Sequence, residues 1–211
     1  RTIEEAESYV AAKEVRIKTI ENSLHSRGVS PERQYKIYGE LFDEYQPFNY
    51  GKAVETLEKQ KEIAMLLGDK SKLNNVYLKE AMLNTAAGEF LEARNDLARV
   101  DTTIFTKEQE IAYCNVQQRF WFDYDENQKG ADKSMPRKVA YYRERLLALA
   151  DPSSSLSRYV TVRKCIDEKN FAQADFINRH SLSRMDPASH DYANLAYFQA
   201  RICEQLNRWE E

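Results

Sequence analysis

Cysteine and histidine are scarce in this chain of 211 residues, with three of each. An odd number of cysteines, none in a CxxC pair, excludes a complete disulfide framework and argues against a cysteine-based zinc site. Cys165 and Cys203 each stand six residues before an aromatic residue, Phe171 and Trp209. We interpret both cysteines as small packing residues buried at equivalent positions. The alternative is a disulfide between them.

Motifs of catalysis are missing as well. The sequence has no HExxH pair, no phosphate-binding loop and no glycine-rich dinucleotide motif. His25, His180 and His190 have no Glu or Cys at a metal-ligand or nucleophile spacing. We therefore expect a protein without enzymatic activity that needs no cofactor and no metal.

The chain has neither an excess of positive charge nor a long apolar run. It carries 31 Lys and Arg against 34 Asp and Glu, a net charge of −3, so we expect no direct contact with nucleic acid. No segment approaches the roughly 18 to 20 apolar residues that cross a bilayer. The sequence begins at Arg1 and stops two residues after Trp209, before a further helix can form. We expect a fragment, whose parent chain can carry a membrane helix that is absent here.

With only six Gly and five Pro, long helices are easily accommodated, and one short pattern recurs along them. A turn residue is followed by an aromatic residue and, three residues later, by an alanine. The copies are Asn49-Tyr50 with Ala53, Gly88-Glu89-Phe90 with Ala93, Asn170-Phe171 with Ala174, and a start at Asn207-Arg208-Trp209. The aromatic residues lie 40, 81 and 38 residues apart, so a degenerate copy is expected between the second and the third. This period indicates an array of helical hairpins.

Apolar residues also align when they are counted back from the four aromatic residues. At the position twelve residues before each aromatic residue, the chain has Tyr38, Leu78, Tyr159 and Tyr197. At the position nine residues before, it has Leu41, Ala81, Val162 and Ala200. Because alanine permits close approach of paired helices, we predict that Ala81 and Ala200 are buried.

A long helix is expected to precede the array, within residues 1–28. Its seam has spacings of three and four and consists of Ile3, Ala6, Val10, Lys13, Ile17, Ile20 and Leu24. This helix either packs on the array behind it or forms a coiled coil with another subunit. Residues 30–211 then form about five degenerate hairpins, the last truncated. The predicted fold is all-α, a right-handed array of antiparallel helix pairs without a sheet.

The third hairpin is irregular. The pattern predicts a helix over residues 107–124 with Tyr124 as the degenerate aromatic residue, a polar loop over residues 125–130, and a helix over residues 136–150. Two similar connectors follow, Asp151-Pro152-Ser153-Ser154 and Asp186-Pro187-Ala188-Ser189. Asp-Pro disfavours continuation of a helix, and the serine can cap the next one.

The repeated turn, aromatic residue and alanine resemble the tetratricopeptide repeat (TPR), over nearly the whole chain after Arg33. The nearest segment to that repeat runs from Tyr50 to Asp69, although the characteristic Trp and Leu-Gly are missing from most units. Three features together are similar to the N-terminal sensor regions of Bacteroidetes signal-transducing transcriptional regulators: the long first helix, the Leu-Gly-Asp stop at residues 67–69, and the aromatic-rich segment 34–45. In that family the repeats are an extracytoplasmic module before a membrane helix and a DNA-binding segment.

The first helices of such hairpins line a concave face, so residues fifteen, twelve, eight and five before each aromatic residue should point toward it. The candidates for a groove that binds an extended peptide are Tyr35, Tyr38, Phe42, Tyr45, Asn75, Met82, Arg163, Tyr197 and Arg201. Tyr38 and Tyr197 alternatively pack between repeats, so Tyr45 and Arg201 are expected to be the better probes of binding. The loop over residues 125–130, with Trp121, is the next candidate.

The predicted function is therefore non-enzymatic binding of a protein or peptide. The resemblance implies the sensor region of a signal-transducing transcriptional regulator, located in the periplasm. The alternative is a self-contained TPR-like adaptor or scaffold for a soluble protein partner, with a cytoplasmic location.

Overall fold

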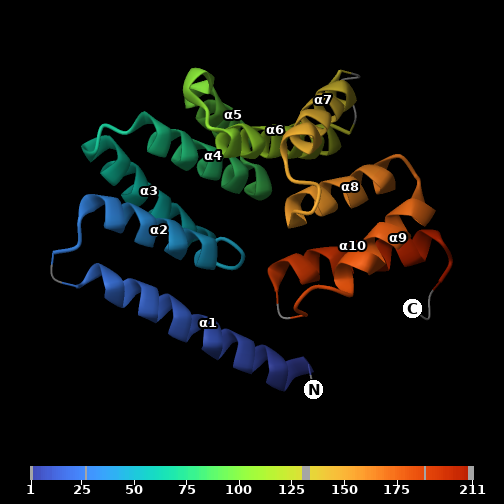
Figure 1. Ribbon diagram of the computed structural model, residues 1–211, viewed down its shortest axis with the longest axis horizontal. Coiled ribbons are helices and arrows are strands. Elements are labelled where there is room, and N and C mark those ends of the chain that lie inside the picture. Colours follow the sequence, from blue (N-terminus) through green and yellow to red (C-terminus); the bar gives the residue numbers. More distant parts are fainter. Residues whose placement is uncertain (1, 27, 130–133, 188, 209–211) are drawn as a thin grey trace. The chain divides into compact units, whose positions relative to one another are not determined.

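The computed structural model describes residues 2–26, 28–129, 134–187 and 189–208, and within these ranges it contains helices and no strand (Figure 1). Consecutive helices pack in pairs joined by short turns, which confirms the all-α, TPR-like array. The elements are α1 (Thr2–Leu24), α2 (Pro31–Tyr45), α3 (Tyr50–Leu66), α4 (Lys70–Ala87), α5 (Phe90–Arg99), the 3-10 turn η1 (Thr102–Ile104), α6 (Lys107–Asn127), α7 (Met135–Leu149), α8 (Ser155–Asp167), α9 (Phe171–Leu182) and α10 (His190–Gln205).

The helix ends are determined by capping residues and by glycine at the turns. Asn49 and Asn170 cap α3 and α9, each accepting a backbone hydrogen bond from the first turn of its helix. Gly88 ends α4 with φ of 81°, in the left-handed region that favours glycine. In the two Asp-Pro connectors, Ser154 and Ser189 cap α8 and α10. The prediction of these serines as caps is confirmed.

The alanine of the repeated pattern lies in the core of the array. Ala53, Ala93 and Ala174 are each fully buried at the start of a second helix. Ala81, predicted to be buried, is also fully buried and shares a core cluster with Ala93. Small side chains at facing positions let the two helices of a pair approach closely, which a larger side chain would prevent.

The chain divides into two compact units, residues 1–136 and 137–211. In unit 1, α2 pairs with α3 and α4 with α5, while α1 packs on α2 and α6 on α4. Its core comprises two clusters, one around Ile37, Leu57 and Val76 and the other around Leu78, Val116 and Phe120.

Helix α1 packs on α2 through its C-terminal half, where Ile17 is buried and Ile20 and Leu24 contact the core. The seam predicted for the whole helix is wrong at Val10, which is 53% exposed. At about 1.5 Å per residue, the 23-residue α1 is longer than the 15-residue α2 that it covers, so its N-terminal part extends past its partner. The side chains of Ile3 and Ala6 lie outside the described residues.

The helix predicted over residues 107–124 forms as α6 but continues to Asn127. Tyr124, expected to be the degenerate aromatic residue, therefore lies inside α6 and does not begin a second helix as Tyr50, Phe90 and Phe171 do. Its ring packs edge-on against Phe90 at 5.5 Å and stacks on Phe120 at 5.8 Å. Residues 125–127 belong to the helix, so the predicted loop begins at Gln128 rather than at Asp125. Gly130, at its end, lies outside the described residues.

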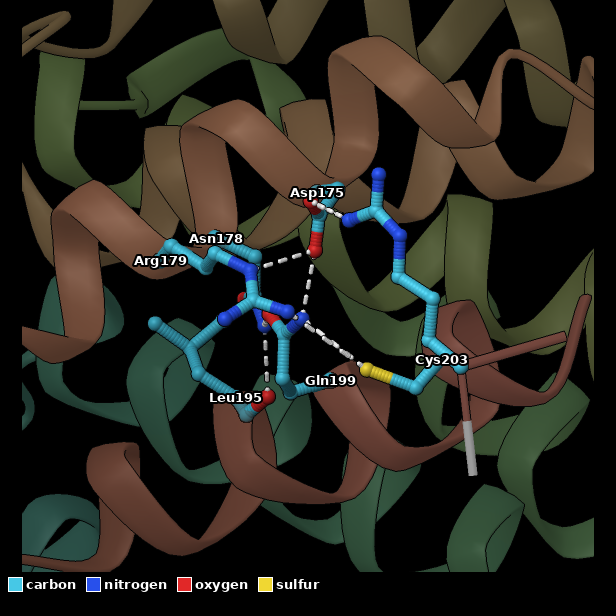
Figure 2. A network of polar contacts seen from close by, with 7 residues as sticks. Asp175, Asn178, Arg179, Leu195, Gln199 and Cys203 are labelled. Atoms are coloured by element: carbon cyan, nitrogen blue, oxygen red, sulfur yellow. Dashed lines mark hydrogen bonds and ion pairs between the residues drawn. The ribbon is translucent and has the colours of Figure 1, made fainter. Parts of the chain in front are cut away.

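In unit 2, α8 pairs with α9, and α10 packs on both. A polar network links α9 to α10 beside a core of Val162, Ala174, Leu195 and Ile202 (Figure 2). Asp175 accepts hydrogen bonds from Arg179 at 2.8 Å, from Gln199 at 2.6 Å and from Arg208 at 2.9 Å. Asn178, fully buried, donates to the backbone oxygen of Leu195 at 2.8 Å and to Gln199 at 2.9 Å.

Cys165 and Cys203 are free and buried, which confirms their interpretation as packing residues, and Cys114 is free and buried as well. The prediction that Ala200 is buried is wrong, because this residue is exposed on α10. The equivalent Ala81 is covered by the second helix of its pair, whereas no helix follows α10 among the described residues. Trp209, the last aromatic residue of the pattern, lies outside the described residues.

Candidate functional site

The first helices of three successive repeats in unit 1 enclose a groove of about 590 Å³, which we call the α2–α4–α6 groove. Its volume is that of a small-ligand or peptide pocket. The lining residues are Tyr35, Lys36, Gly39, Glu40, Phe42, Asp43 and Gln46 from α2, Gln60 from α3, Asn75, Leu78, Lys79 and Met82 from α4, and Ala112, Asn115 and Val116 from α6.

Apolar side chains and one glycine form the floor of the groove. Leu78 and Val116 belong to the core cluster beneath it, and Met82 and Ala112 pack against the same cluster. Gly39, in the middle of α2, leaves the backbone bare at this point, and Gln60 fills the adjacent space from α3. The Gln60 side chain is 3% exposed and donates from Nε2 to the backbone oxygen of Tyr35 at 2.9 Å.

Lys79 provides a positive charge at a fixed position in the groove. Its Nζ lies 4.6 Å from the ring centroid of Phe42, in a cation–π contact, and 3.2 Å from the carboxylate of Asp43. The Asp43 side chain is largely exposed. An ion pair with one exposed partner is weak, so a ligand carboxylate can replace Asp43 at Lys79 with little loss.

One end of the groove is held rigidly by buried hydrogen bonds. The Tyr35 hydroxyl donates to the backbone oxygen of Lys72 at 3.0 Å, and burial raises the pKa of Tyr35 to about 12. Asn75 accepts from Gln109 of α6 at 2.9 Å, and Gln109 also donates to the backbone oxygen of Ser71 at 2.7 Å. These contacts tie α4 to α6.

The sequence-predicted site residues are divided among three places. Tyr35, Phe42, Asn75 and Met82 line the α2–α4–α6 groove together. Tyr38 and Tyr45 instead line a separate cavity of about 540 Å³, bounded by α1, α2 and α3. Arg163, Tyr197 and Arg201 belong to unit 2, on α8 and α10.

Tyr45 differs most from its predicted role as a partly exposed probe. Its side chain belongs to a core cluster and is 8% exposed, and its hydroxyl donates to Glu21 of α1 at 2.9 Å. Burial, together with the hydrogen bond to Glu21, raises the pKa of Tyr45 to about 12. The extra helix α1 covers this side of α2, which a count of positions within the repeat cannot anticipate.

Several groove residues were not found by sequence reasoning, namely Lys36, Gly39, Glu40, Asp43, Gln46, Gln60, Lys79, Ala112, Asn115 and Val116. For two of them a signal existed: Ala112 and Val116 stand twelve and eight residues before Tyr124, the spacing used in the other repeats. The charged residues had no such signal, because they alternate with solvent-exposed charges throughout the helices.

The groove offers hydrogen-bond donors, acceptors and apolar surface. Within the part of the chain that the structure describes, no group of three or more His, Cys, Asp or Glu side chains is placed to hold a metal ion. None of the described helices is both long and apolar enough to cross a membrane. The arrangement is suited to binding an extended chain.

Comparison with known families matches residues 3–211 to the family described as the SusR N-terminal TPR domain. Comparison with curated proteins and with solved structures gives no match. The matched region spans nearly the whole chain, so it contains both the groove and unit 2. The chain therefore belongs to the family of SusR N-terminal TPR domains.

Proposed function

We propose that the α2–α4–α6 groove binds an extended peptide segment of a protein partner. TPR domains are protein-interaction repeats, and membership of this family places the chain among them. The observation that carries the proposal is that the first helices of three successive repeats line one hollow. Apolar residues form its floor, while amides and charges form its rim.

The chemistry of the groove matches an extended backbone with alternating side chains. Leu78, Met82 and Val116 can bury an apolar side chain, and Asn115 and Gln46 at the rim carry amides that pair with peptide N–H and C=O groups. Four of the proposed partner-binding residues, Tyr35, Phe42, Asn75 and Met82, lie here.

The proposal is tested by blocking the groove. Peptides are selected from a displayed library of random heptapeptides against the 211-residue chain, and their affinities are then measured for two tryptophan variants. Ala112→Trp fills the groove floor and should abolish binding. Leu91→Trp places the same side chain on the exposed surface of α5, outside the groove, and should leave binding unchanged.

A second variant distinguishes loss of binding from loss of folding. Lys36 and Glu40 line the rim of the groove and are exposed, so replacing both with Ala should weaken binding without changing the melting temperature. Selected peptides that bind both groove variants as tightly as the unmodified chain would place the binding surface elsewhere.

We further propose that the domain is the sensor region of a signal-transducing transcriptional regulator and lies in the periplasm. The support is the family match together with the resemblance to Bacteroidetes regulators. In the full-length parent, a groove variant should then abolish the transcriptional response while the protein remains accessible to protease in spheroplasts. An adaptor in the cytoplasm, the alternative, predicts protection from protease and unchanged transcription.

A further inference from the structure

In unit 1, a hydrogen bond between two amides joins neighbouring first helices of the array. Asn75 of α4 and Gln109 of α6 occupy the same repeat position, fifteen residues before Phe90 and Tyr124 respectively. Gln109 is 3% exposed, and its Nε2 donates to Oδ1 of Asn75 at 2.9 Å. This bond bridges α4 and α6 at that level of the array.

Unit 2 lacks the corresponding bond. The position fifteen residues before Phe171 is Leu156 of α8, and the position fifteen residues before Trp209 is Asn194 of α10. The two helices are in contact, as α4 and α6 are, and both side chains are half-buried. Leucine has no group that can pair with an amide. Among the described residues, the Asn194 side chain therefore has no hydrogen-bond partner.

A cavity of about 340 Å³ lies where this bond is missing, and we call it the Leu156–Asn194 cavity. It is bounded by α8, by α10 and by the connector between α9 and α10. Met185 of the connector and Tyr159 of α8 pack against the core of unit 2, so the cavity has a firm apolar base. The lining residues are Ser155, Leu156, Tyr159, Met185, Asn194 and Leu195.

Two polar groups of the lining are available to a ligand. The ring of Tyr159 is held by stacking on Phe198, with centroids 5.1 Å apart, and its hydroxyl has no hydrogen-bond partner among the described residues. The Asn194 amide offers both a donor and an acceptor. Oγ of Ser155 already lies 3.5 Å from Nη2 of Arg158, which is not itself a lining residue.

The size and the charge of the cavity restrict what it can hold. Small-molecule pockets range from about 300 to 1,000 Å³, so this cavity suits a compact molecule rather than an extended chain. None of its lining residues carries a formal charge at neutral pH. An ionised group would therefore lose its hydration in the cavity without gaining a partner of opposite charge, which is costly.

We propose that the Leu156–Asn194 cavity binds a small, uncharged, mainly apolar molecule with one hydrogen-bonding group. That group pairs with the Asn194 amide, in the role that the Gln109 amide has at Asn75. Leu156, Met185 and Leu195 contact the apolar part of the molecule. The site lies within unit 2, is separate from the α2–α4–α6 groove and does not rest on the function proposed for that groove.

The test uses the 211-residue chain and N-phenyl-naphthylamine, a neutral aromatic amine with one N–H group and a fluorescence that rises in apolar surroundings. Titration should show saturable binding. Anilinonaphthalene sulfonate has the same rings and amine but an ionised group, and it should bind at least about tenfold more weakly. Equal or tighter binding of the sulfonate, or no saturable binding of the neutral probe, would overturn the proposal.

A variant that restores the missing bond should close the cavity. In Leu156→Gln, the new amide can reach Asn194 as Gln109 reaches Asn75, so probe binding should be lost while the melting temperature stays the same or rises. Leu156→Met, the matched control, keeps the apolar character and the volume and should bind the probe as the unmodified chain does. Undiminished binding of the probe to Leu156→Gln would contradict the proposal.

Asn194→Leu tests the polar contact separately. It removes the amide and keeps a side chain of similar size. Because Asn194 has no side-chain partner among the described residues, the melting temperature should not fall. The probe should bind roughly fivefold more weakly through the loss of one hydrogen bond. An unchanged affinity would show that Asn194 does not hold the ligand.

This proposal and the one for unit 1 can fail separately. Ala112→Trp, which fills the α2–α4–α6 groove, should leave probe binding unchanged, and Leu156→Gln should leave the binding of groove-selected peptides unchanged. Probe binding that is lost in Ala112→Trp but kept in Leu156→Gln would assign the probe to the groove. That result would overturn the assignment to unit 2 and leave the function proposed for the groove intact.

Discussion

Replacing Gly39 with alanine should destabilise the protein, although alanine is the better helix former. A Cβ atom at this position of α2 would lie 2.8 Å from Nε2 of Gln60, closer than side chains normally approach. Gln60 is 3% exposed, and its Nε2 is bonded to the backbone oxygen of Tyr35. The amide can therefore move away only by breaking a buried hydrogen bond.

The expected magnitude is the difference of two opposing effects. Alanine in a helix interior is favoured over glycine by about 1 kcal/mol. Overpacking and a buried amide left without its partner cost about 1 to 3 kcal/mol each. The free energy of unfolding should fall by about 1 to 2 kcal/mol in Gly39→Ala, since the two costs arise from one displacement and overlap.

Gly51 provides the matched control. It lies in the first turn of α3, where a Cβ atom would meet only Oδ1 of Asn49 at 3.8 Å, an ordinary contact. Gly51→Ala should be neutral or stabilising by up to about 1 kcal/mol. Urea unfolding followed by far-ultraviolet circular dichroism measures both variants against the unmodified chain.

A third variant separates the close contact from other effects. In a Gln60→Ala background the obstruction is gone, so adding Gly39→Ala should raise the free energy of unfolding instead of lowering it. If Gly39→Ala stabilises the protein as much as Gly51→Ala does, the close approach of α2 and α3 at this point does not exist.

The helices and their pairing were predictable from local residues. The turn residues Asn49, Gly88 and Asn170 fix helix ends through capping and positive φ, which depend on the neighbouring sequence alone. Ala53 and Ala93 identify the close contacts because only a small side chain fits there. Such features repeat along the chain, so one copy predicts the others.

The candidate site was less predictable, because it depends on contacts between distant segments. Tyr45 occupies the repeat position expected to face the groove, yet Glu21 of α1 binds its hydroxyl. Tyr124 lies inside α6 and not at the start of a second helix, and its ring contacts Phe90 of α5. From the sequence alone, Gly39 is a residue that lowers helix stability. The position of the Gln60 side chain explains why glycine is present there, because a Cβ atom at residue 39 would be too close to it.

Three further predictions follow from burial and charge. Ala81→Leu should overpack the contact between α4 and α5 and cost about 1 to 3 kcal/mol, so an unchanged melting temperature would contradict the packing described. Tyr45→Phe should lose about 1 kcal/mol through the hydrogen bond to Glu21, yet leave peptide binding in the groove unchanged. Asp175→Asn should destabilise the protein in a pH-dependent manner. Burial acts to raise the pKa of this carboxyl, but its hydrogen bonds from Arg179 and Gln199 outweigh burial and hold the pKa below its ordinary value of 3.8. A pKa that is lower in the folded than in the unfolded state means that the carboxylate stabilises the fold above about pH 4 and loses this contribution as the pH falls through the folded-state value. The difference in unfolding free energy between the unmodified chain and Asp175→Asn should therefore be largest near neutral pH and should vanish in acid. We expect about 1 kcal/mol near neutral pH, because the Arg179 side chain that pairs with Asp175 is half-exposed. A difference that stays constant from neutral to strongly acidic pH would show that the charge of Asp175 does not hold α9 to α10.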